Sequence, residues 1–167
     1  ENKAGASGLL AAASVAHSAP DGYTILLSSP APITTFPHLQ KLNFDPLKDL
    51  TPVTLVVRFA LIWAKRSGLE VNSIPDLIDL EKKMEKKGAK LTIGYSGIGG
   101  SNHLAILMLN QMADIHLLPV PYKGESPALM DLMGGQVDLV VTTLASAMAS
   151  LQGGQISALA TTVSERT

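Results

Sequence analysis

The sequence predicts an α/β fold in which a largely parallel sheet is covered by helices on both faces. Runs typical of buried strands alternate along the chain with runs of helical spacing. Residues 90–113 join a short strand, a glycine-rich turn and a helix into one unit, as connections in such folds do. With 167 residues, of which 46% are hydrophobic, the chain has room for one ordinary domain or for two small lobes that share a core.

The first third of the chain is expected to hold a helix, a strand and a polar loop. Residues 6–18 are rich in Ala and Leu, which favours a helix, and a turn at residues 20–22 separates them from a strand at 23–28. The loop at 28–37 contains three prolines and follows the carboxyl end of that strand. The β-branched stretch at 51–64 is longer than a typical strand, so we expect it to pass from one lobe into another.

The rest of the chain is expected to alternate helices and strands. Ser73 caps a helix that runs to about Lys87, in which Leu77 supplies apolar surface and the charged residues, Glu81 among them, stay in water. The next helix, 101–113, is amphipathic, with apolar residues at helical spacing: Leu104, Leu107, Met108 and Met112. The remaining expected elements are a strand at 117–121, a helix at 128–133, a strand at 136–143, a helix at 144–151 and a strand at 156–163.

The glycine-rich turn before Ser101 is the strongest candidate for a ligand site. Glycines let the backbone approach a ligand closely, and the first turn of a helix carries unpaired N–H groups and a partial positive charge that hold phosphate or carboxylate. Three polar side chains gather at this helix start, those of Ser96, Ser101 and Asn102. Close packing alone is the alternative explanation for the glycines, because a Gly-x-Gly pattern is weak by itself.

Other polar residues add candidates. Thr34 and Thr35 lie in the loop at 28–37, at the kind of strand end where open α/β sheets place ligands, although a plain connector is the simpler interpretation. Tyr122 is expected to serve a pocket or hinge, with its hydroxyl toward a polar cleft. For His103 a structural role is favoured over proton transfer, and Lys123 either attracts an anion at long range or is simply solvated.

Composition argues against several functions. The net charge of −1 opposes an electrostatic grip on nucleic acid, and no apolar run is long enough to cross a bilayer. The absence of cysteine excludes disulfides and thiolate metal sites, and the four histidines lack metal-ligand spacing, so we expect neither a metal nor a cofactor. No nucleophile elbow is present. The sequence begins at Glu1 without a visible signal peptide, as a processed or truncated product would.

Several blocks of the sequence match a known family, in order along the chain. They are Pro20-Asp21-Gly22-Tyr23-Thr24, Phe44-Asp45-Pro46, Thr51-Pro52-Val53-Thr54, Gly94-Tyr95-Ser96-Gly97, Val120-Pro121-Tyr122-Lys123-Gly124 and Gly134-Gly135-Gln136-Val137-Asp138. The series resembles the Bug-type, TctC-like solute-binding receptors of tripartite tricarboxylate transporters, and the resemblance runs through essentially the whole chain.

The resemblance implies a type II periplasmic-binding-protein architecture. Two α/β lobes would close on a small carboxylate in the periplasm and hand it to membrane permease subunits, and no bond would be made or broken. Residues 1–64 would form a partial first lobe with a crossover strand, 65–155 the second lobe, and 156–167 a return crossover strand. Both lobes would supply ligand-binding residues: Ser28, Ser29, Thr34, Thr35, Ser96, Gly97, Ile98, Gly99, Gly100, Ser101, Asn102, His103, Tyr122, Thr142 and Thr143.

The sequence also departs from the family pattern. Members usually have a further strand and a Pro-Gly-Gly-rich loop upstream, and a C-terminal part that returns to the first lobe, so we expect a fragment whose first lobe is incomplete. Exposed strand edges in such a fragment favour a homodimer or a domain swap. Glu125 stands where small residues are common and Thr35 where Asn is frequent. The carboxylate therefore stays open among aliphatic, tricarboxylic, aromatic and amino acids.

Two other functions stay open at this point. The ligand-sensing domain of a transcription regulator shares the two-lobe architecture, although the sequence holds no helix-turn-helix with basic residues. A nucleotide-binding enzyme domain would need an acidic residue about 20 residues after the glycines, at a strand end. Asp114 is near that distance but precedes an apolar segment instead, so this alternative is the weaker one.

Overall fold

The computed structural model describes residues 1–3 and 5–163. The chain divides into two compact units, which we call unit 1 and unit 2. Unit 1 comprises Glu1–Val57 and Ile98–Ser101, and unit 2 comprises Arg58–Gly97 and the residues from Asn102 on. The division falls after Val57, and the turn 98–101 belongs to unit 1, while the lobe boundary expected after residue 64 stays a prediction.

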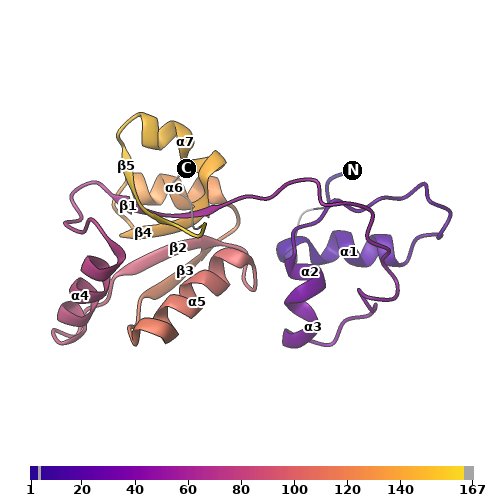
Figure 1. The fold of residues 1–167 in the computed structure, drawn as a ribbon, viewed down its shortest axis with the longest axis horizontal. Coiled ribbons are helices and arrows are strands. Elements are labelled where there is room, and N and C mark those ends of the chain that lie inside the picture. Colours follow the sequence, from indigo (N-terminus) through magenta and orange to yellow (C-terminus); the bar gives the residue numbers. More distant parts are fainter. Residues whose placement is uncertain (4, 164–167) are drawn as a thin grey trace. The chain divides into compact units, whose positions relative to one another are not determined.

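Unit 2 is built on a five-stranded sheet of order β3-β2-β4-β1-β5 (Figure 1). The strands are β1 (Leu61–Arg66), β2 (Thr92–Ser96), β3 (Leu118–Tyr122), β4 (Leu139–Thr143) and β5 (Ile156–Thr161). β2 pairs in parallel with β3 and β4, whereas β1 pairs antiparallel with β4 and β5. All described strands except β1 thus run in one direction, which agrees with the expected parallel-rich sheet.

Helices cover both faces of this sheet, as the alternation of elements predicted. Figure 1 shows α4 (Ile74–Glu85) and α5 (Ser101–Ala113) on one side, and α6 (Glu125–Met133) and α7 (Leu144–Gln152) on the other. One core packs Leu77 of α4 and Ile106 of α5 against strand residues such as Ile93. The other packs Leu132 of α6 and Ala147 of α7 against the opposite face. The two cores form because side chains alternate between faces along each strand.

The two segments expected to cross between lobes, 51–64 and 156–167, contribute β1 and β5 to the sheet of unit 2. Only Leu61–Arg66 of the expected strand 51–64 forms a strand, and residues 51–60 are irregular and almost wholly exposed, so that prediction was wrong for most of its length. β5 pairs with β1 inside unit 2. Residues 164–167 of the expected return crossover lie outside the described residues.

The only regular elements of unit 1 in its described part are short helices, and no described residue of it belongs to a strand. Its elements are η1 (Ala6–Gly8), α1 (Leu9–Ala16), α2 (Ala31–Thr34) and α3 (Phe36–Leu39). The predicted strand at 23–28 does not form, and Ile25 and Leu27 are 77% and 79% exposed. A strand needs a hydrogen-bonded neighbour, and no described segment pairs with this one. The polar loop expected at 28–37 contains α2 and the start of α3.

Two details of unit 2 also overturn predictions. The apolar stripe of α5 does not face the core: Leu104, Leu107, Met108 and Met112 are exposed, while Asn102 and Ile106 are buried. α5 carries apolar residues on most of its surface, so their spacing could not select the buried face. Glu81, expected in water, is fully buried, because it follows Leu77 by four residues and shares its helix face.

Asp138, directly before β4, ties β1, β2 and β4 together. Its carboxylate accepts hydrogen bonds from Arg66 Nε at 2.9 Å and from Thr92 N and Oγ1 at 3.0 Å each. The Arg66–Asp138 pair is partly buried, so it is less screened than a surface ion pair. This network fixes the end of β1 to the starts of β2 and β4.

Candidate ligand-binding site

The carboxyl ends of β2 and β4 form a topological switch point in the sheet. From β2 the chain passes to β3 on one side, then returns across β2 to β4 on the other. The connecting helices α5, α6 and α7 all begin at this edge, where β2, β3 and β4 end. In open α/β sheets ligands bind outside the carboxyl ends of the strands at such a switch point.

Asn102 and Glu125 meet at this switch point from opposite faces of the sheet. Asn102, buried in the first turn of α5, donates from Nδ2 to the carbonyl oxygen of Val141 at 2.9 Å and to Glu125 Oε1 at 3.4 Å. Glu125, in the first turn of α6, accepts from the Thr143 amide at 3.3 Å and from the Thr143 hydroxyl at 2.7 Å. One carboxylate therefore joins α5, α6 and the end of β4.

The Glu125 carboxylate is held in its charged form. Burial by itself raises the pKa of Glu125, but hydrogen bonds, those from Ser146 and Thr143 foremost, outweigh burial and bring that pKa below its ordinary value. The N-terminus of α6 also favours a negative charge in the first turn. At neutral pH a fixed negative charge thus stands at the switch point.

Thr142 and Thr143, both predicted to contact ligand, differ in their surroundings. Thr142 is fully buried inside β4. Thr143 is half-buried, and its hydroxyl oxygen accepts from the Ser146 amide at 3.4 Å, which caps α7, as well as donating to Glu125. Sequence reasoning missed Ser146, although a threonine three residues before a serine at a helix start is a recognisable cap pattern.

The glycine turn packs closely against unit 1 helices. Gly99 and Gly100 are buried, Gly97 and Gly99 have positive φ angles of 76° and 77°, and a Cβ on Gly99 would lie 3.3 Å from both Phe36 Cε1 and Leu39 Cδ1. The Ile98 carbonyl accepts a hydrogen bond from Ser7 Oγ at 3.1 Å. Close packing therefore explains why a glycine stands at position 99. This was the alternative to a ligand-binding role for the glycine turn.

His103 and Tyr122 both have contacts within unit 2. The His103 ring stacks on Tyr95 with centroids 4.6 Å apart and planes 11° apart, and burial lowers the pKa of His103 and so favours the neutral ring. The Tyr122 hydroxyl donates to Asp131 Oδ2 at 2.6 Å. Burial, with that hydrogen bond, raises the pKa of Tyr122 to about 12. Its ring packs so closely on Gly94 that a Cβ there would lie 3.1 Å from Tyr122 Cε2.

The remaining predicted residues lie in unit 1. Ser28 and Ser29 are exposed, and a Cβ on Gly8, which precedes α1, would lie 3.9 Å from each of their hydroxyl oxygens. Thr34 is turned to its own helix, since its hydroxyl donates to the Pro30 carbonyl at 3.0 Å. Thr35 is half-buried between α2 and α3. The two serine hydroxyls thus gather near the start of α1.

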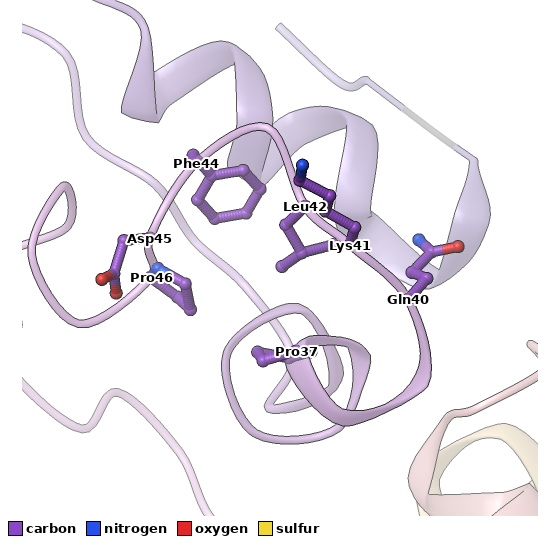
Figure 2. A pocket seen from close by; sticks show the side chains of 7 residues that line it. All are labelled: Pro37, Gln40, Lys41, Leu42, Phe44, Asp45 and Pro46. Atoms are coloured by element: carbon purple, nitrogen blue, oxygen red, sulfur yellow. The ribbon is translucent and has the colours of Figure 1, made fainter.

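Unit 1 also contains a hollow of about 340 Å³ that involves none of the predicted residues (Figure 2). Its lining consists of Pro37, Gln40, Lys41, Leu42, Phe44, Asp45 and Pro46. The Asp45 carboxylate is already engaged, at 3.0 Å from the Leu47 amide and 2.9 Å from Lys48 Nζ. Those contacts shape the loop itself, so we place the candidate site at the switch point instead.

The described residues hold no group of three or more metal-ligating side chains that could bind an ion. None of the helices they form has the length and hydrophobicity needed to cross a membrane. Asp114, considered for a ribose contact, follows the end of α5 in a turn with a positive φ of 50°, whereas the switch point lies at the start of that helix.

Unit 2 is a doubly wound α/β unit with polar side chains at its switch point, and the chain also forms a second compact unit. Small-molecule-binding proteins use this architecture. The model of the tripartite tricarboxylate transporter family receptor (TctC) matches residues 1–167, and the chain belongs to this family. The resemblance stated from the sequence blocks is thereby confirmed.

Similar proteins include two of known structure. R. palustris Rpa4515 with adipate is 32% identical with a TM-score of 0.88, over 99% of this chain and 55% of that one. MatC (Rpa3494) from Rhodopseudomonas palustris with bound malate is 30% identical with a TM-score of 0.82, over 99% and 56%. A curated relative, the UPF0065 protein in the TAR-I ttuE-ttuC' intergenic region of Agrobacterium vitis, is 34% identical over 139 residues, 83% of this chain and 39% of its own length. The chain thus spans about half the length of its relatives or less.

Proposed function

We propose that this chain is part of an extracytoplasmic receptor that binds a small carboxylate unchanged and delivers it to the membrane permease of a tripartite tricarboxylate-type transporter. The observation that carries the proposal is the match of 99% of the chain, at a TM-score of 0.88, to a protein of known structure described with adipate. The malate-bound relative supports the same class of ligand. A periplasmic location follows from the proposed role.

The site geometry supports a binding function without catalysis. The switch point offers the N-terminus of α5 and the Ser96 and Ser101 side chains. In unit 1, the Ser29 hydroxyl near the start of α1 is a further donor suited to a carboxylate, whereas the Ser28 hydroxyl donates to the Ser29 carbonyl at 2.9 Å. Such groups hold an anion by hydrogen bonds and partial charge, and require neither a nucleophile nor a metal.

A ligand panel tests the carboxylate class. The purified chain is screened by thermal shift with adipate, malate, citrate, benzoate, aspartate and ATP, and any stabilising compound is then titrated by calorimetry. A ligand that binds only the native state raises the melting temperature with concentration. We expect stabilisation by at least one carboxylate and none by ATP. Stabilisation by ATP alone, or by no compound at millimolar concentration, contradicts the proposal.

Delivery to a permease needs its own measurement. Membrane vesicles that contain the transporter subunits are incubated with the radiolabelled carboxylate found in the panel, with and without the purified chain. We expect uptake that depends on the chain. Equal uptake in both cases contradicts the delivery part of the proposal and leaves ligand binding standing.

As part of the same proposal, we infer that exposed apolar segments of unit 1 pair with a second copy of the chain. Tyr23, Ile25 and Leu27 are 92%, 77% and 79% exposed, and Val53 is 82% exposed. Extended apolar segments without neighbours pair readily with another chain. Sedimentation at micromolar concentration is expected to show a dimer that Val53→Lys weakens, and a monomer at all concentrations contradicts this inference.

A further inference from the structure

We infer that Glu125 determines which carboxylates the receptor accepts. Its charge at the switch point disfavours a second ligand carboxylate there, so the chain selects acids whose far end carries a hydroxyl or ammonium group over dicarboxylates. The inference rests on the proposed function, because it concerns the selectivity of the same site.

The first step is that Glu125 already uses the donors a ligand carboxylate would need. The Thr143 amide and hydroxyl lie 3.3 and 2.7 Å from its two oxygens, and Asn102 Nδ2 lies 3.4 Å from Oε1. Asn102 and Thr143 were both predicted to contact ligand. In the structure these donors serve a carboxylate that belongs to the protein itself.

The second step is that this charge has no ion-pair partner among the residues that the structure describes. Among the described residues the ion pairs are Lys3–Glu1, Lys48–Asp45, Arg66–Asp138 and His116–Glu85, and none involves Glu125. The nearest cationic residue in sequence, Lys123, is exposed. Two carboxylates placed side by side at one site cannot both ionise without a large penalty. A dicarboxylate that extends to the switch point meets this repulsion.

The third step is that Glu125 can still accept a better hydrogen bond. Both contacts to Oε1 are long, 3.3 and 3.4 Å, whereas good N–H···O bonds are near 2.9 Å. The side chain is half-buried, so one part of it faces solvent. A ligand hydroxyl or ammonium group there would gain a charge-assisted hydrogen bond, which is stronger than a neutral one.

The test compares ligands of equal length that differ only at one end: adipate, 6-hydroxyhexanoate and 6-aminohexanoate. Dissociation constants are measured by calorimetry for the wild type, for Glu125→Gln and for Glu85→Gln, which removes a partly exposed carboxylate near the end of α4. We expect the wild type to bind both monocarboxylates about tenfold tighter than adipate, and E125Q to remove that preference. E85Q is expected to keep it.

The ratio of affinities separates selectivity from a structural role. Loss of a purely structural contact would weaken all three ligands equally and leave the ratio unchanged. Glu125→Asp, which keeps the charge, is expected to keep the wild-type ratio and serves if E125Q proves unfolded by circular dichroism. A wild type that prefers adipate, or a ratio unaltered in E125Q, overturns the inference while the receptor proposal stands. Failure of every protein to bind any of the three acids overturns the inference, whereas the receptor proposal is decided by the wider ligand panel.

Discussion

At the scale of single residues, Gly99 combines a backbone requirement with a packing requirement. Its φ of +77° lies in the left-handed region, where a side chain is strained. A Cβ would also lie 3.3 Å from Phe36 and Leu39 atoms, closer than ordinary contact. Gly88 has a similar φ of +74°, but a Cβ added there would meet no atom within 4 Å. The two glycines therefore allow the two requirements to be measured separately.

Substitution of these glycines by alanine should give different losses. We expect Gly88→Ala to lower the free energy of unfolding by about 1 kcal/mol through backbone strain alone. Gly99→Ala should cost at least about 1 kcal/mol more, because overpacking adds to the strain. Urea denaturation of both variants measures the difference. Equal losses would show that Gly99 is not closely packed.

Glu81 is a buried carboxylate within the core under α4. Its Oε2 accepts a hydrogen bond from the Leu91 amide at 2.8 Å, while Oε1 has no hydrogen-bond partner in the described part of the chain. Burial raises the pKa of Glu81 above its ordinary value of 4.5. The native state therefore binds this proton more tightly than the unfolded state does. Stability from the protonated form is fully present below pH 4.5 and is lost as the pH rises through the native pKa.

Glu81→Gln should remove this pH dependence. We expect the unfolding free energy of the variant, relative to wild type, to increase steadily as the pH is raised from 4.5 through the native pKa. Guanidinium denaturation at a series of pH values measures it. Asp79→Asn removes an exposed carboxylate from the same helix and controls for the loss of charge. A difference between E81Q and wild type that is constant with pH would refute the argument.

At the scale of elements, α5 presents its larger apolar residues to solvent. Met108 and Met112 are 59% and 80% exposed, whereas Ile106 is 0% exposed and belongs to the core with Ile93 and Tyr95. Ala105, Leu109 and Ala113 pack beside it. The contact with the sheet is thus made by Ile106 and by mostly small neighbours.

Substitutions on the two faces of α5 should separate clearly. Ile106→Ala is expected to cost about 2–5 kcal/mol of unfolding free energy, because it leaves a cavity in the core. Met112→Gln should change stability by no more than about 0.5 kcal/mol, as exposed substitutions do. Chemical denaturation distinguishes the two. A large loss for M112Q would mean that the exposed stripe is covered in solution.

At the scale of the whole molecule, the two units have different kinds of architecture. Unit 2 has a paired sheet between two cores, whereas unit 1 has short helices and long irregular segments in its described part. Residues 51–60 are irregular and lead into β1. Exposed backbone without secondary structure opens readily to proteases, while core strands open only with global unfolding.

Limited proteolysis should therefore cut unit 1 segments first. Thermolysin, which cleaves before apolar residues, is expected to cut within 23–29 and 51–60 before any site in β1 or β4. The apolar residues of α5, although exposed, should be protected by helical structure. Mass spectrometry of the early fragments identifies the sites. First cuts inside β4 would contradict this ranking of local stability.

An element predicted from the sequence formed in the structure where other segments of the chain pair with it or pack against it. Alternating runs predicted the strands and helices of unit 2 well, because each strand there finds partners. The same pattern failed at 23–28, whose apolar residues have no strand beside them among the described residues. The reversal of β1 could not be predicted either, since the hydrophobicity of a strand does not indicate the direction in which it pairs with its neighbours.

The sequence indicated where in the fold the candidate residues lie, but it did not indicate which residues they contact. Glycines, hydroxyls and Asn102 predicted a ligand site at the start of the 101–113 helix, and that helix starts at the switch point of the sheet. That a ligand binds there stays a prediction. The sequence could not show that Glu125 would accept hydrogen bonds from both Asn102 and Thr143, because these donors lie 23 and 18 residues from it along the chain. Nor could it show that the Tyr122 hydroxyl would turn to Asp131.

The sequence by itself determined the family, the alternation of strands and helices, and the absence of cysteine chemistry, since these depend on residue types and their order. The tertiary structure alone decided which face of α5 is buried, which way β1 runs and what occupies the switch point. Those outcomes depend on contacts between segments distant along the chain. In particular, the negative charge of Glu125 is stabilised by donors from other elements, and local sequence does not specify them.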